Sequence, residues 1–263
     1  MANNGIFDLS GKVALVTGGG SGIGRAYCEA MAEYGADVAC NDIDLQSALE
    51  TVEILGKFGH KAIAIEADVS KQDDIEKMVD RTVKELGSLD IVFCNAGIGL
   101  AGGRIHEIPV DIWDRTMELN LRGTFLLMQA ALRYMVKQKS GNIITTASVA
   151  GTWVGGEGKN FTELTPYGVS KAGVVMLTKF AASEYGKDGI RVNSINPGFH
   201  RTNILNSLPP EQRKEREDLM IKNTALRRIA ETEELKGVAV WLASDASSYV
   251  TGQIITQDGG LTL

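Results

Sequence analysis

Residues 12–24 read KVALVTGGGSGIG, and this stretch decides the fold. Lys12–Thr17 is a short apolar run of the kind that forms a buried strand, and a glycine-rich turn ends it. From Ile23 to Tyr34, apolar residues recur at helical spacing, which predicts an amphipathic helix directly after the turn. Glycines let the backbone approach a ligand closely, and the first N–H groups of a helix attract negative charge. The stretch therefore predicts a strand, a phosphate-binding turn and a helix; the competing interpretation is a tight connection without a ligand.

The rest of the chain repeats this alternation of short β-rich runs and helical segments. Such alternation is typical of a parallel sheet that is covered by helices on both faces. The sequence contains no internal repeat, linker or low-complexity segment. We therefore predict an α/β protein over residues 1–263, a single doubly wound domain of Rossmann type with a seven-stranded parallel sheet flanked by helices. The expected strands are Lys12–Thr17, Asp37–Asn41, Lys61–Ala67, Leu89–Cys94, Asn142–Ala147, Arg191–Asn196 and Gln253–Gln257.

Composition limits the partners and the surroundings of the chain. Its 27 Lys and Arg against 33 Asp and Glu give a net charge of -6, which argues against nucleic acid or an anionic membrane as a partner. The three cysteines are odd in number and lie in apolar stretches, so we expect buried thiols in a reducing compartment. No segment reads as a signal peptide or a membrane span, and we expect a cytoplasmic protein. The three histidines lack metal-ligand spacing, so we predict no catalytic metal.

An acidic residue at the end of the second strand indicates which nucleotide the turn would bind. Asp42 stands 18 residues beyond Gly24, a spacing at which a carboxylate accepts hydrogen bonds from the adenosine ribose hydroxyls. Its charge would repel a 2′-phosphate, and the next four residues include no Arg or Lys. Asp44 is placed to cap the following helix, which leaves Asp42 for the ribose. We therefore predict NAD rather than NADP as the cofactor.

A tyrosine and a lysine four residues apart form the expected chemical centre. Tyr167 and Lys171 open a long apolar helix, in which this spacing puts both side chains on one face. A nearby ammonium and an oxidised nicotinamide both favour the phenolate, so we expect the pKa of Tyr167 to fall below its usual value of about 10. The pair alone is common by chance, but Ser148 ends the fifth strand, at the carboxyl edge where ligands of open α/β sheets bind. Asn95, Asn120 and the Pro197-Gly198 pair also follow or close apolar segments.

At these residues the chain resembles the short-chain dehydrogenase/reductase family, from about residue 12 to residue 260. Thr17-Gly18-x-x-x-Gly22-x-Gly24 matches the family's cofactor motif, Asn95-Ala96-Gly97 its sheet motif, and Tyr167-x-x-x-Lys171 its active-site motif. Pro197-Gly198 with Thr202 matches the segment that faces the nicotinamide. The cofactor contacts that the resemblance implies are Gly18, Ser21, Gly22, Ile23, Gly24, Asp42, Asp68, Val69, Asn95, Gly97, Tyr167, Lys171, Pro197, Gly198, His200 and Thr202.

The resemblance also implies a catalytic tetrad of Asn120, Ser148, Tyr167 and Lys171. In it, Tyr167 would be the general acid/base, and Ser148 would hold the substrate oxygen by a hydrogen bond. Lys171 would bind the nicotinamide ribose and depress the pKa of the tyrosine. Asn120 would support a water that links Lys171 to bulk solvent.

Three positions depart from the family pattern. Cys94 stands where the family often has Asn, and we expect it to pack in the strand. His200 replaces a β-branched or apolar residue whose backbone meets the nicotinamide amide, so its imidazole is a candidate pocket wall. Ser148 and Tyr167 are separated by 18 residues, several more than is usual in the family. The extra segment, about 152–164, is a candidate flap at the substrate site, with a tolerated surface insertion as the alternative. By the same resemblance, residues 203–226 are expected to form a lid.

The helix after Tyr167 is apolar nearly all round, which predicts burial on both of its sides. A sheet covers only one side, so we expect a homo-oligomer, and members of the family are commonly tetramers.

The sequence thus predicts an NAD-dependent oxidoreductase that interconverts a secondary alcohol and a ketone by hydride transfer. Phe7–Lys12 resembles the opening of sugar-acid and polyol dehydrogenases of the family, while a 3-oxoacyl-thioester reductase and a hydroxysteroid dehydrogenase stay open. A methyltransferase shares the glycine turn and the acidic residue but needs no Ser, Tyr and Lys together. A non-catalytic NAD-binding regulator is the alternative from another functional class, and an intact tetrad argues against it.

Overall fold

Seven parallel strands form the centre of the protein, in the order β3-β2-β1-β4-β5-β6-β7. The computed structural model describes residues 5–100, 102–155, 162–202 and 210–263. All seven predicted strands are present, and the doubly wound Rossmann-type architecture is confirmed. The strands are β1 Val13–Thr17, β2 Asp37–Asp42, β3 Ala62–Glu66, β4 Ile91–Cys94, β5 Gly141–Thr146, β6 Ile190–Pro197 and β7 Ile254–Gln257.

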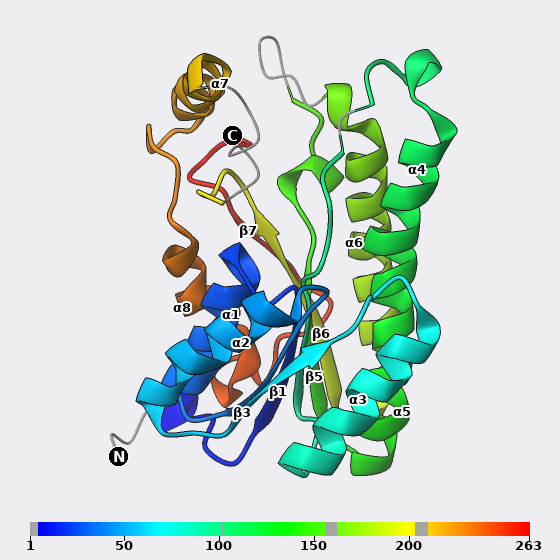
Figure 1. Ribbon diagram of the computed structural model, residues 1–263, viewed down its shortest axis with the longest axis vertical. Helices are drawn as coiled ribbons and strands as arrows, with labels where there is room; N and C mark the ends of the chain where they lie inside the picture. The colour runs from blue at the N-terminus through cyan, green and yellow to red at the C-terminus, as the bar shows by residue number, and fades with distance from the viewer. Residues whose placement is uncertain (1–4, 101, 156–161, 203–209) are drawn as a thin grey trace.

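Helices cover both faces of this sheet, with α1, α2 and α8 on one side and α3, α4, α5 and α6 on the other (Figure 1). The helices are α1 Gly22–Glu33, α2 Leu45–Leu55, α3 Gln72–Leu86, α4 Val110–Met117, α5 Gly123–Gln138, α6 Thr165–Tyr185, α7 Pro210–Asn223 and α8 Lys236–Ala243. The shorter helical turns are η1 Gly5–Phe7, η2 Gly56–Phe58, η3 Ile105–Glu107, η4 Glu118–Arg122, η5 Val149–Gly151, η6 Thr162–Leu164, η7 Gly186–Asp188, η9 Thr232–Leu235 and η10 Asp245–Ser247. None of the helices in the described ranges is long and apolar enough to cross a membrane.

The alternation of side chains along the strands produces a large hydrophobic core on each face of the sheet. In β1, Leu15 belongs to the core under α3 and α5, whereas Ala14 and Val16 belong to the core under α1 and α8. In the second core, the rings of Tyr27 and Phe93 lie with their centroids 4.7 Å apart, and both are fully buried. Burial of this apolar surface on both faces is the main driving force for the fold.

The order of the strands decides where a ligand can bind. The chain winds outward from β1 in one direction through β2 and β3, and then restarts at β4 on the other side of β1. At such a switch point the connections leave β1 and β4 in opposite directions, which opens a crevice at the carboxyl edge of the sheet. The charged helix α7 also stands at this edge, at the top of Figure 1. The segments that carry the predicted site residues therefore converge on one end of the molecule.

Candidate active site

The turn between β1 and α1 requires glycine for steric reasons. A Cβ on Gly24 would lie 2.0 Å from the carbonyl oxygen of Gly18, and Gly18 itself has a φ of +64°, where L side chains are strained. Helix α1 starts at Gly22, and its N-cap, Ser21, makes no side-chain capping bond. A Cβ on Gly22 would lie 3.7 Å from Cγ2 of Thr202, so the predicted nicotinamide segment faces the start of α1. The turn is thus a glycine cradle at a helix N-terminus, which fits a pyrophosphate.

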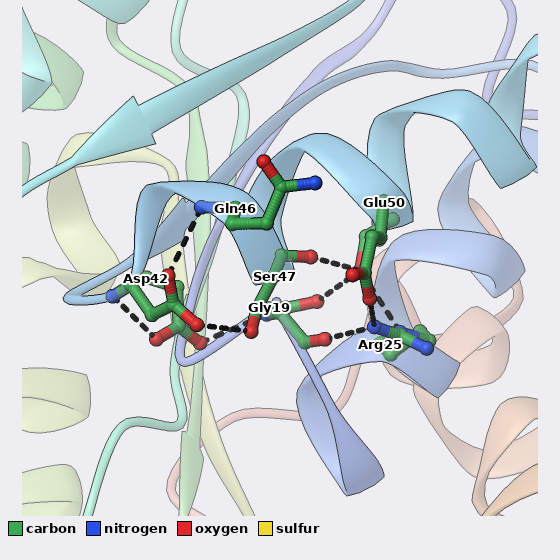
Figure 2. Close-up of polar contacts among 9 residues, drawn as sticks. Gly19, Arg25, Asp42, Gln46, Ser47 and Glu50 are labelled. Carbon is green, nitrogen blue, oxygen red and sulfur yellow. Dashed lines mark hydrogen bonds and ion pairs between the residues drawn. The ribbon is translucent and has the colours of Figure 1, made fainter.

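Asp42 ends β2 beside this cradle, and backbone N–H groups hold both of its carboxylate oxygens. Oδ2 accepts from the N–H of Gly20 at 3.0 Å and Oδ1 from the N–H of Asp44 at 3.1 Å (Figure 2). Asp44 in turn caps α2 by accepting from the N–H of Gln46 at 3.0 Å, which confirms the predicted cap. Each carboxylate oxygen of Asp42 thus accepts one hydrogen bond from the backbone, and its remaining lone pairs can accept from a ligand.

A surface hollow lies at the end of β3, lined among others by Asp68, Met78 and Ile43, the residue after Asp42. The side chain of Asp68 is fixed by the backbone N–H of Ser70 at 2.9 Å, and Val69 next to it is buried. Asp68 therefore lines this hollow just beyond the end of β3, with Val69 buried beside it.

Asn95 ties together the ends of three neighbouring strands. Its Nδ2 donates to the carbonyl oxygen of Thr17 at 2.9 Å, and its Oδ1 accepts from the hydroxyl of Thr146 at 3.2 Å. Gly97, two residues later, passes close to the buried polar centre, because a Cβ there would lie 3.2 Å from Oδ1 of Asn120 and 3.3 Å from Nζ of Lys171. The Asn-Ala-Gly segment thus fixes the strand ends on which the site is built.

Three of the four predicted tetrad residues meet between β5 and α6. Ser148 is the N-cap of η5, where its hydroxyl accepts from the N–H of Ala150 at 3.2 Å, and it lowers the pKa of the nearby Tyr167 phenol. Nζ of Lys171 lies 5.7 Å from the ring centroid of Tyr167 and donates to the carbonyl oxygen of Thr146 at 2.7 Å. Burial lowers the pKa of Lys171 to about 8, because the ammonium has lost most of its hydration. The contact with Thr146 was not predicted, and it carries no sequence signal because any residue has a backbone carbonyl.

The predicted fall in the pKa of Tyr167 is wrong for the protein by itself. Burial raises the pKa of this phenol, and the hydrogen bond with Ser148 offsets only part of that rise. The reason is that the phenolate would lose its hydration, while the ammonium of Lys171 is engaged by Thr146. The helical spacing brings the two groups together, but it does not make the ammonium a direct partner of the phenol oxygen.

Asn120 lies in η4, a π-helical turn between α4 and α5, and is fully buried. Its Oδ1 accepts from the N–H of Ile98 at 2.8 Å, and its Nδ2 donates to the carbonyl oxygen of Ile98 at 2.8 Å and to the hydroxyl of Ser170 at 3.0 Å. The side chain thus joins the segment after β4 to helix α6, between Tyr167 and Lys171. The sequence indicated neither the π turn nor the role of Ser170.

The segment after β6 crosses the carboxyl edge of the sheet. Gly198 donates its N–H to Gln257 at 3.0 Å, and a Cβ there would lie 2.6 Å from Cα of Asp258, so this position after Pro197 admits only glycine. His200 contacts the Gly198 carbonyl through Nδ1 at 3.2 Å, and burial lowers the pKa of its imidazole. Its Nε2 is buried and has no hydrogen-bond partner within the described ranges.

The predicted insertion and lid meet at an ion pair. Residues 156–161 and 203–209, which belong to these two predictions, lie outside the described residues. Glu163, at the end of the insertion, accepts at its backbone carbonyl from the N–H of Gly102 at 2.9 Å. Its carboxylate lies 3.5 Å from Nη2 of Arg216 in α7. The end of the insertion and helix α7 therefore approach each other at this pair.

The described ranges hold no group of three or more His, Cys, Asp or Glu residues arranged to bind a metal ion. The cysteines Cys28, Cys40 and Cys94 are free and buried. Burial raises the pKa of the Cys94 thiol to about 12, which suits packing in β4 rather than reactivity.

Known proteins are similar to this chain in both sequence and fold. The family model described as Enoyl-(Acyl carrier protein) reductase matches residues 18–262. The chain is 38% identical over 251 residues to cis-4-hydroxycyclohexanecarboxylate dehydrogenase of Sinomonas cyclohexanicum, covering 95% of this chain and 96% of that protein. It is 36% identical over 255 residues to the 3-oxoacyl-acyl-carrier-protein reductase of Thermotoga maritima, covering 97% and 99%.

Among solved structures, a short-chain type dehydrogenase/reductase from Mycobacterium marinum is similar with a TM-score of 0.90, 40% identity and 98% of each chain covered. A 7α-hydroxysteroid dehydrogenase complexed with NADH is similar with a TM-score of 0.88, 31% identity and coverage of 99% of this chain and 98% of that one. A gluconate 5-dehydrogenase from Burkholderia cenocepacia in complex with NADP and tartrate is similar with a TM-score of 0.89, 32% identity and coverage of 98% and 97%. The glycine cradle, the meeting of Ser148, Tyr167 and Lys171 and these likenesses agree, and the chain belongs to the short-chain dehydrogenase/reductase family of oxidoreductases.

Proposed function

We propose that this protein is an NAD-dependent dehydrogenase that interconverts a secondary alcohol and the corresponding ketone. The observation that carries the proposal is the convergence of Ser148, Tyr167 and Lys171 at the carboxyl edge of the sheet, the edge at which the glycine turn after β1 also lies. A protein that only binds a nucleotide has no use for a buried phenol paired with a hydroxyl and an ammonium. Their joint presence therefore supports catalysis over a purely regulatory role.

The cradle would hold the cofactor through its backbone and a few side chains. The pyrophosphate would contact Gly18, Ser21, Gly22, Ile23 and Gly24 at the start of α1, with Thr202 on the opposite side. Asp42 would accept hydrogen bonds from the adenosine ribose hydroxyls, and Asp68 and Val69 would flank the adenine. Asn95, Gly97, Pro197, Gly198 and the backbone of His200 would surround the nicotinamide half. When bound, the nicotinamide supplies the hydride acceptor or donor.

Side chains of the protein would transfer the proton that leaves or enters the substrate oxygen. In the direction of alcohol oxidation, Tyr167 would take the hydroxyl proton of the substrate, and in the reverse direction it would return a proton to the carbonyl oxygen. Ser148 would donate a hydrogen bond to the same substrate oxygen as charge develops on it. The positive charges of Lys171 and of an oxidised nicotinamide would oppose the effect of burial and bring the pKa of Tyr167 down. Asn120 would keep a proton route from Lys171 to solvent.

The carboxylate of Asp42 is what favours NAD over NADP. The 2′-phosphate that NADP carries in place of the ribose 2′-hydroxyl would meet the fixed negative charge of Asp42. Ile43, the next residue, is apolar and 65% exposed, so it offers the phosphate no positive charge. Relatives bind either cofactor, so the discrimination has to come from the residues of this chain.

The proposed substrate is a small secondary alcohol, with sugar acids and polyols first, as the segment Phe7–Lys12 indicates. A 3-oxoacyl thioester and a hydroxysteroid are the alternatives, since relatives carry those activities in their names. The test is absorbance at the reduced-nicotinamide band, with NAD and NADP, over a panel of sugar acids, polyols, steroids, cyclic alcohols and 3-oxoacyl thioesters. Turnover with NAD on at least one secondary alcohol supports the proposal. Turnover with NADP alone would overturn the cofactor assignment, and cofactor binding without any turnover would favour the regulator.

The proposed assembly is a homo-oligomer, with a tetramer favoured. Helix α6 leaves Val169, Met176 and Phe180 exposed by 42%, 49% and 61% in the single chain, although its sequence is apolar nearly all round. A second copy of the chain would cover this face.

A further inference from the structure

The Gly19–Gly20 peptide links the side chain of Asp42 to helix α2. The N–H of Gly20 is the group that donates to Oδ2 of Asp42 at 3.0 Å, and the carbonyl oxygen of Gly19 belongs to the same planar peptide unit. That carbonyl oxygen accepts from the hydroxyl of Thr51, which lies in α2 and is fully buried, at 2.9 Å. Because the peptide is planar and trans, fixing its oxygen toward Thr51 aims its N–H in the opposite direction, at Asp42.

Arg25 completes this arrangement from helix α1. Its Nε donates to Oγ1 of Thr51 at 3.0 Å, and its Nη2 donates to the carbonyl oxygen of Gly20. Both carbonyls of the Gly19–Gly20 pair are therefore bound to the guanidinium, one directly and one through the Thr51 hydroxyl. Figure 2 shows Arg25 reaching back between the glycine turn and α2, with Glu50 as its carboxylate neighbour at 3.5 Å.

The neighbouring strand holds the preceding peptide of the turn, since the N–H of Gly19 donates to the carbonyl oxygen of Asn41 at 2.7 Å, but this bond belongs to the Gly18–Gly19 peptide and not to the Gly19–Gly20 peptide. Glycine has no side chain to restrict rotation, and a Cβ on Gly20 would lie 2.7 Å from Oδ2 of Asp42, so only glycine allows the carboxylate to approach. Backbone rotation at Gly19 and Gly20 is therefore restricted by hydrogen bonds from other segments. The bond from the charged guanidinium of Arg25 is of the stronger kind, because hydrogen bonds to charged groups are stronger than those between neutral groups.

We propose that Thr51 and Arg25 are positioning residues for Asp42, and that they set the preference for a 2′-hydroxyl over a 2′-phosphate. They act through the Gly19–Gly20 peptide and do not themselves touch the ribose. With the peptide fixed, Asp42 keeps one orientation, in which it accepts from the ribose hydroxyls and repels a phosphate. With the peptide free, Asp42 keeps only the bond from the N–H of Asp44 and can rotate about it, which weakens binding of NAD and relieves the repulsion of NADP at the same time. The inference rests on the proposed role of Asp42 in binding NAD.

The test compares the dissociation constants of NADH and NADPH, measured by fluorescence titration without any substrate. Thr51→Val removes the hydroxyl at nearly constant shape, and Arg25→Gln removes the guanidinium at a partly exposed site. In both variants we expect the ratio of the NADPH constant to the NADH constant to fall about tenfold, which is the effect of losing roughly one hydrogen bond. Thr51→Ser keeps the hydroxyl and should hold the ratio within about twofold of the wild type.

The matched control is Thr82→Val in α3. Thr82 is also fully buried in a helix, but among the described residues its hydroxyl donates only to the carbonyl oxygen of Met78 one turn earlier, at 2.9 Å. Its ratio should stay at the wild-type value, even if thermal stability drops. If Thr51→Val or Arg25→Gln weakens NADH and NADPH by the same factor, the two residues are merely structural and the inference is overturned. A wild-type protein that binds NADPH more tightly than NADH would overturn the cofactor proposal itself, which this experiment reports separately.

Discussion

Nζ of Lys171 donates to the carbonyl oxygen of Thr146 at 2.7 Å. Thr146 is the last residue of β5 and precedes Ser148 by two residues, so the end of this strand binds the buried ammonium. The contact couples the site to the sheet, because the carbonyl belongs to a strand that is paired on both sides. It also explains how an ammonium that is only 4% exposed keeps a hydrogen-bond partner.

Replacing Lys171 by Met should remove turnover and change how stability depends on pH. Burial lowers the pKa of Lys171 from 10.5 to about 8 in the folded protein. Between these two values the unfolded chain binds a proton that the folded protein does not, so the free energy of unfolding of the wild type rises with pH across this window. Lys171→Met lacks that rise. The free energy of unfolding of the variant, relative to that of the wild type, should therefore be highest below pH 8 and should fall between pH 8 and pH 10.5. Urea unfolding at a series of pH values measures this difference. Lys84→Met, at an exposed position of α3, is the control, and parallel curves for Lys171→Met and the wild type would contradict the prediction.

Replacing Tyr167 by Phe should separate chemistry from binding. The variant keeps the ring and loses the proton-transferring oxygen, so we expect kcat to fall by roughly a thousandfold, as for loss of a general acid/base. The dissociation constant of NADH should change only a few-fold, because the cradle is untouched. Tyr249→Phe, at a fully exposed tyrosine, should leave both quantities unchanged. Retention of most of the activity in Tyr167→Phe would show that another group moves the proton.

Replacing Asn120 by Leu should damage stability as well as activity. The change leaves the N–H and the carbonyl of Ile98 without their side-chain partner and also removes the bond to Ser170. Unpaired buried polar groups cost about 1–3 kcal/mol each, so a loss of several kcal/mol in the free energy of unfolding is expected. Urea unfolding of Asn120→Leu beside Gln129→Leu, an exposed amide of α5, measures the difference. Equal stability of the two variants would mean that the Ile98 groups find other partners.

Replacing Gly24 by Ala should abolish cofactor binding. The new Cβ would lie 2.0 Å from the carbonyl oxygen of Gly18, so the turn has to open or shift. Gly237→Ala in α8 is a matched control, since nothing lies within 4 Å of a Cβ there. In a helix that second change should stabilise the protein by up to about 1 kcal/mol. Isothermal titration calorimetry gives the dissociation constant of NADH for both variants. Tight binding by Gly24→Ala would contradict the close approach of Gly24 to the carbonyl oxygen of Gly18.

Placing a charge on the exposed face of α6 should shift the assembly to smaller species. Phe180→Glu would bury an unpaired carboxylate in a subunit interface, which is costly, whereas Leu49→Glu on α2 adds the same charge elsewhere. Light scattering at micromolar concentration should give an oligomer for the wild type and for Leu49→Glu, and a smaller species for Phe180→Glu. A monomeric wild type would contradict the proposed oligomer.

Much of the fold follows from local sequence alone. The run Lys12–Thr17 and the glycines after it define a strand and a turn without help from distant residues, because sterics at Gly18 and Gly24 exclude other side chains. All seven strands were predicted within two residues of their ends, since buried parallel strands are short apolar runs with clear polar boundaries. The cap of α2 by Asp44 was also predictable, because an N-cap lies one residue before its helix.

The positions of the site residues relative to one another depend on the tertiary structure. The sequence places Tyr167 and Lys171 on one helix face, but only the packing of α6 against β5 turns the ammonium to Thr146 and raises the pKa of the phenol. Likewise, the glycine turn identifies a nucleotide site, yet the path from Arg25 through Thr51 to the Gly19 carbonyl joins residues up to 32 positions apart. Side-chain spacing along the chain sets which groups are available. Desolvation and contacts between distant segments set their charge and direction, and those exist only after the chain has folded.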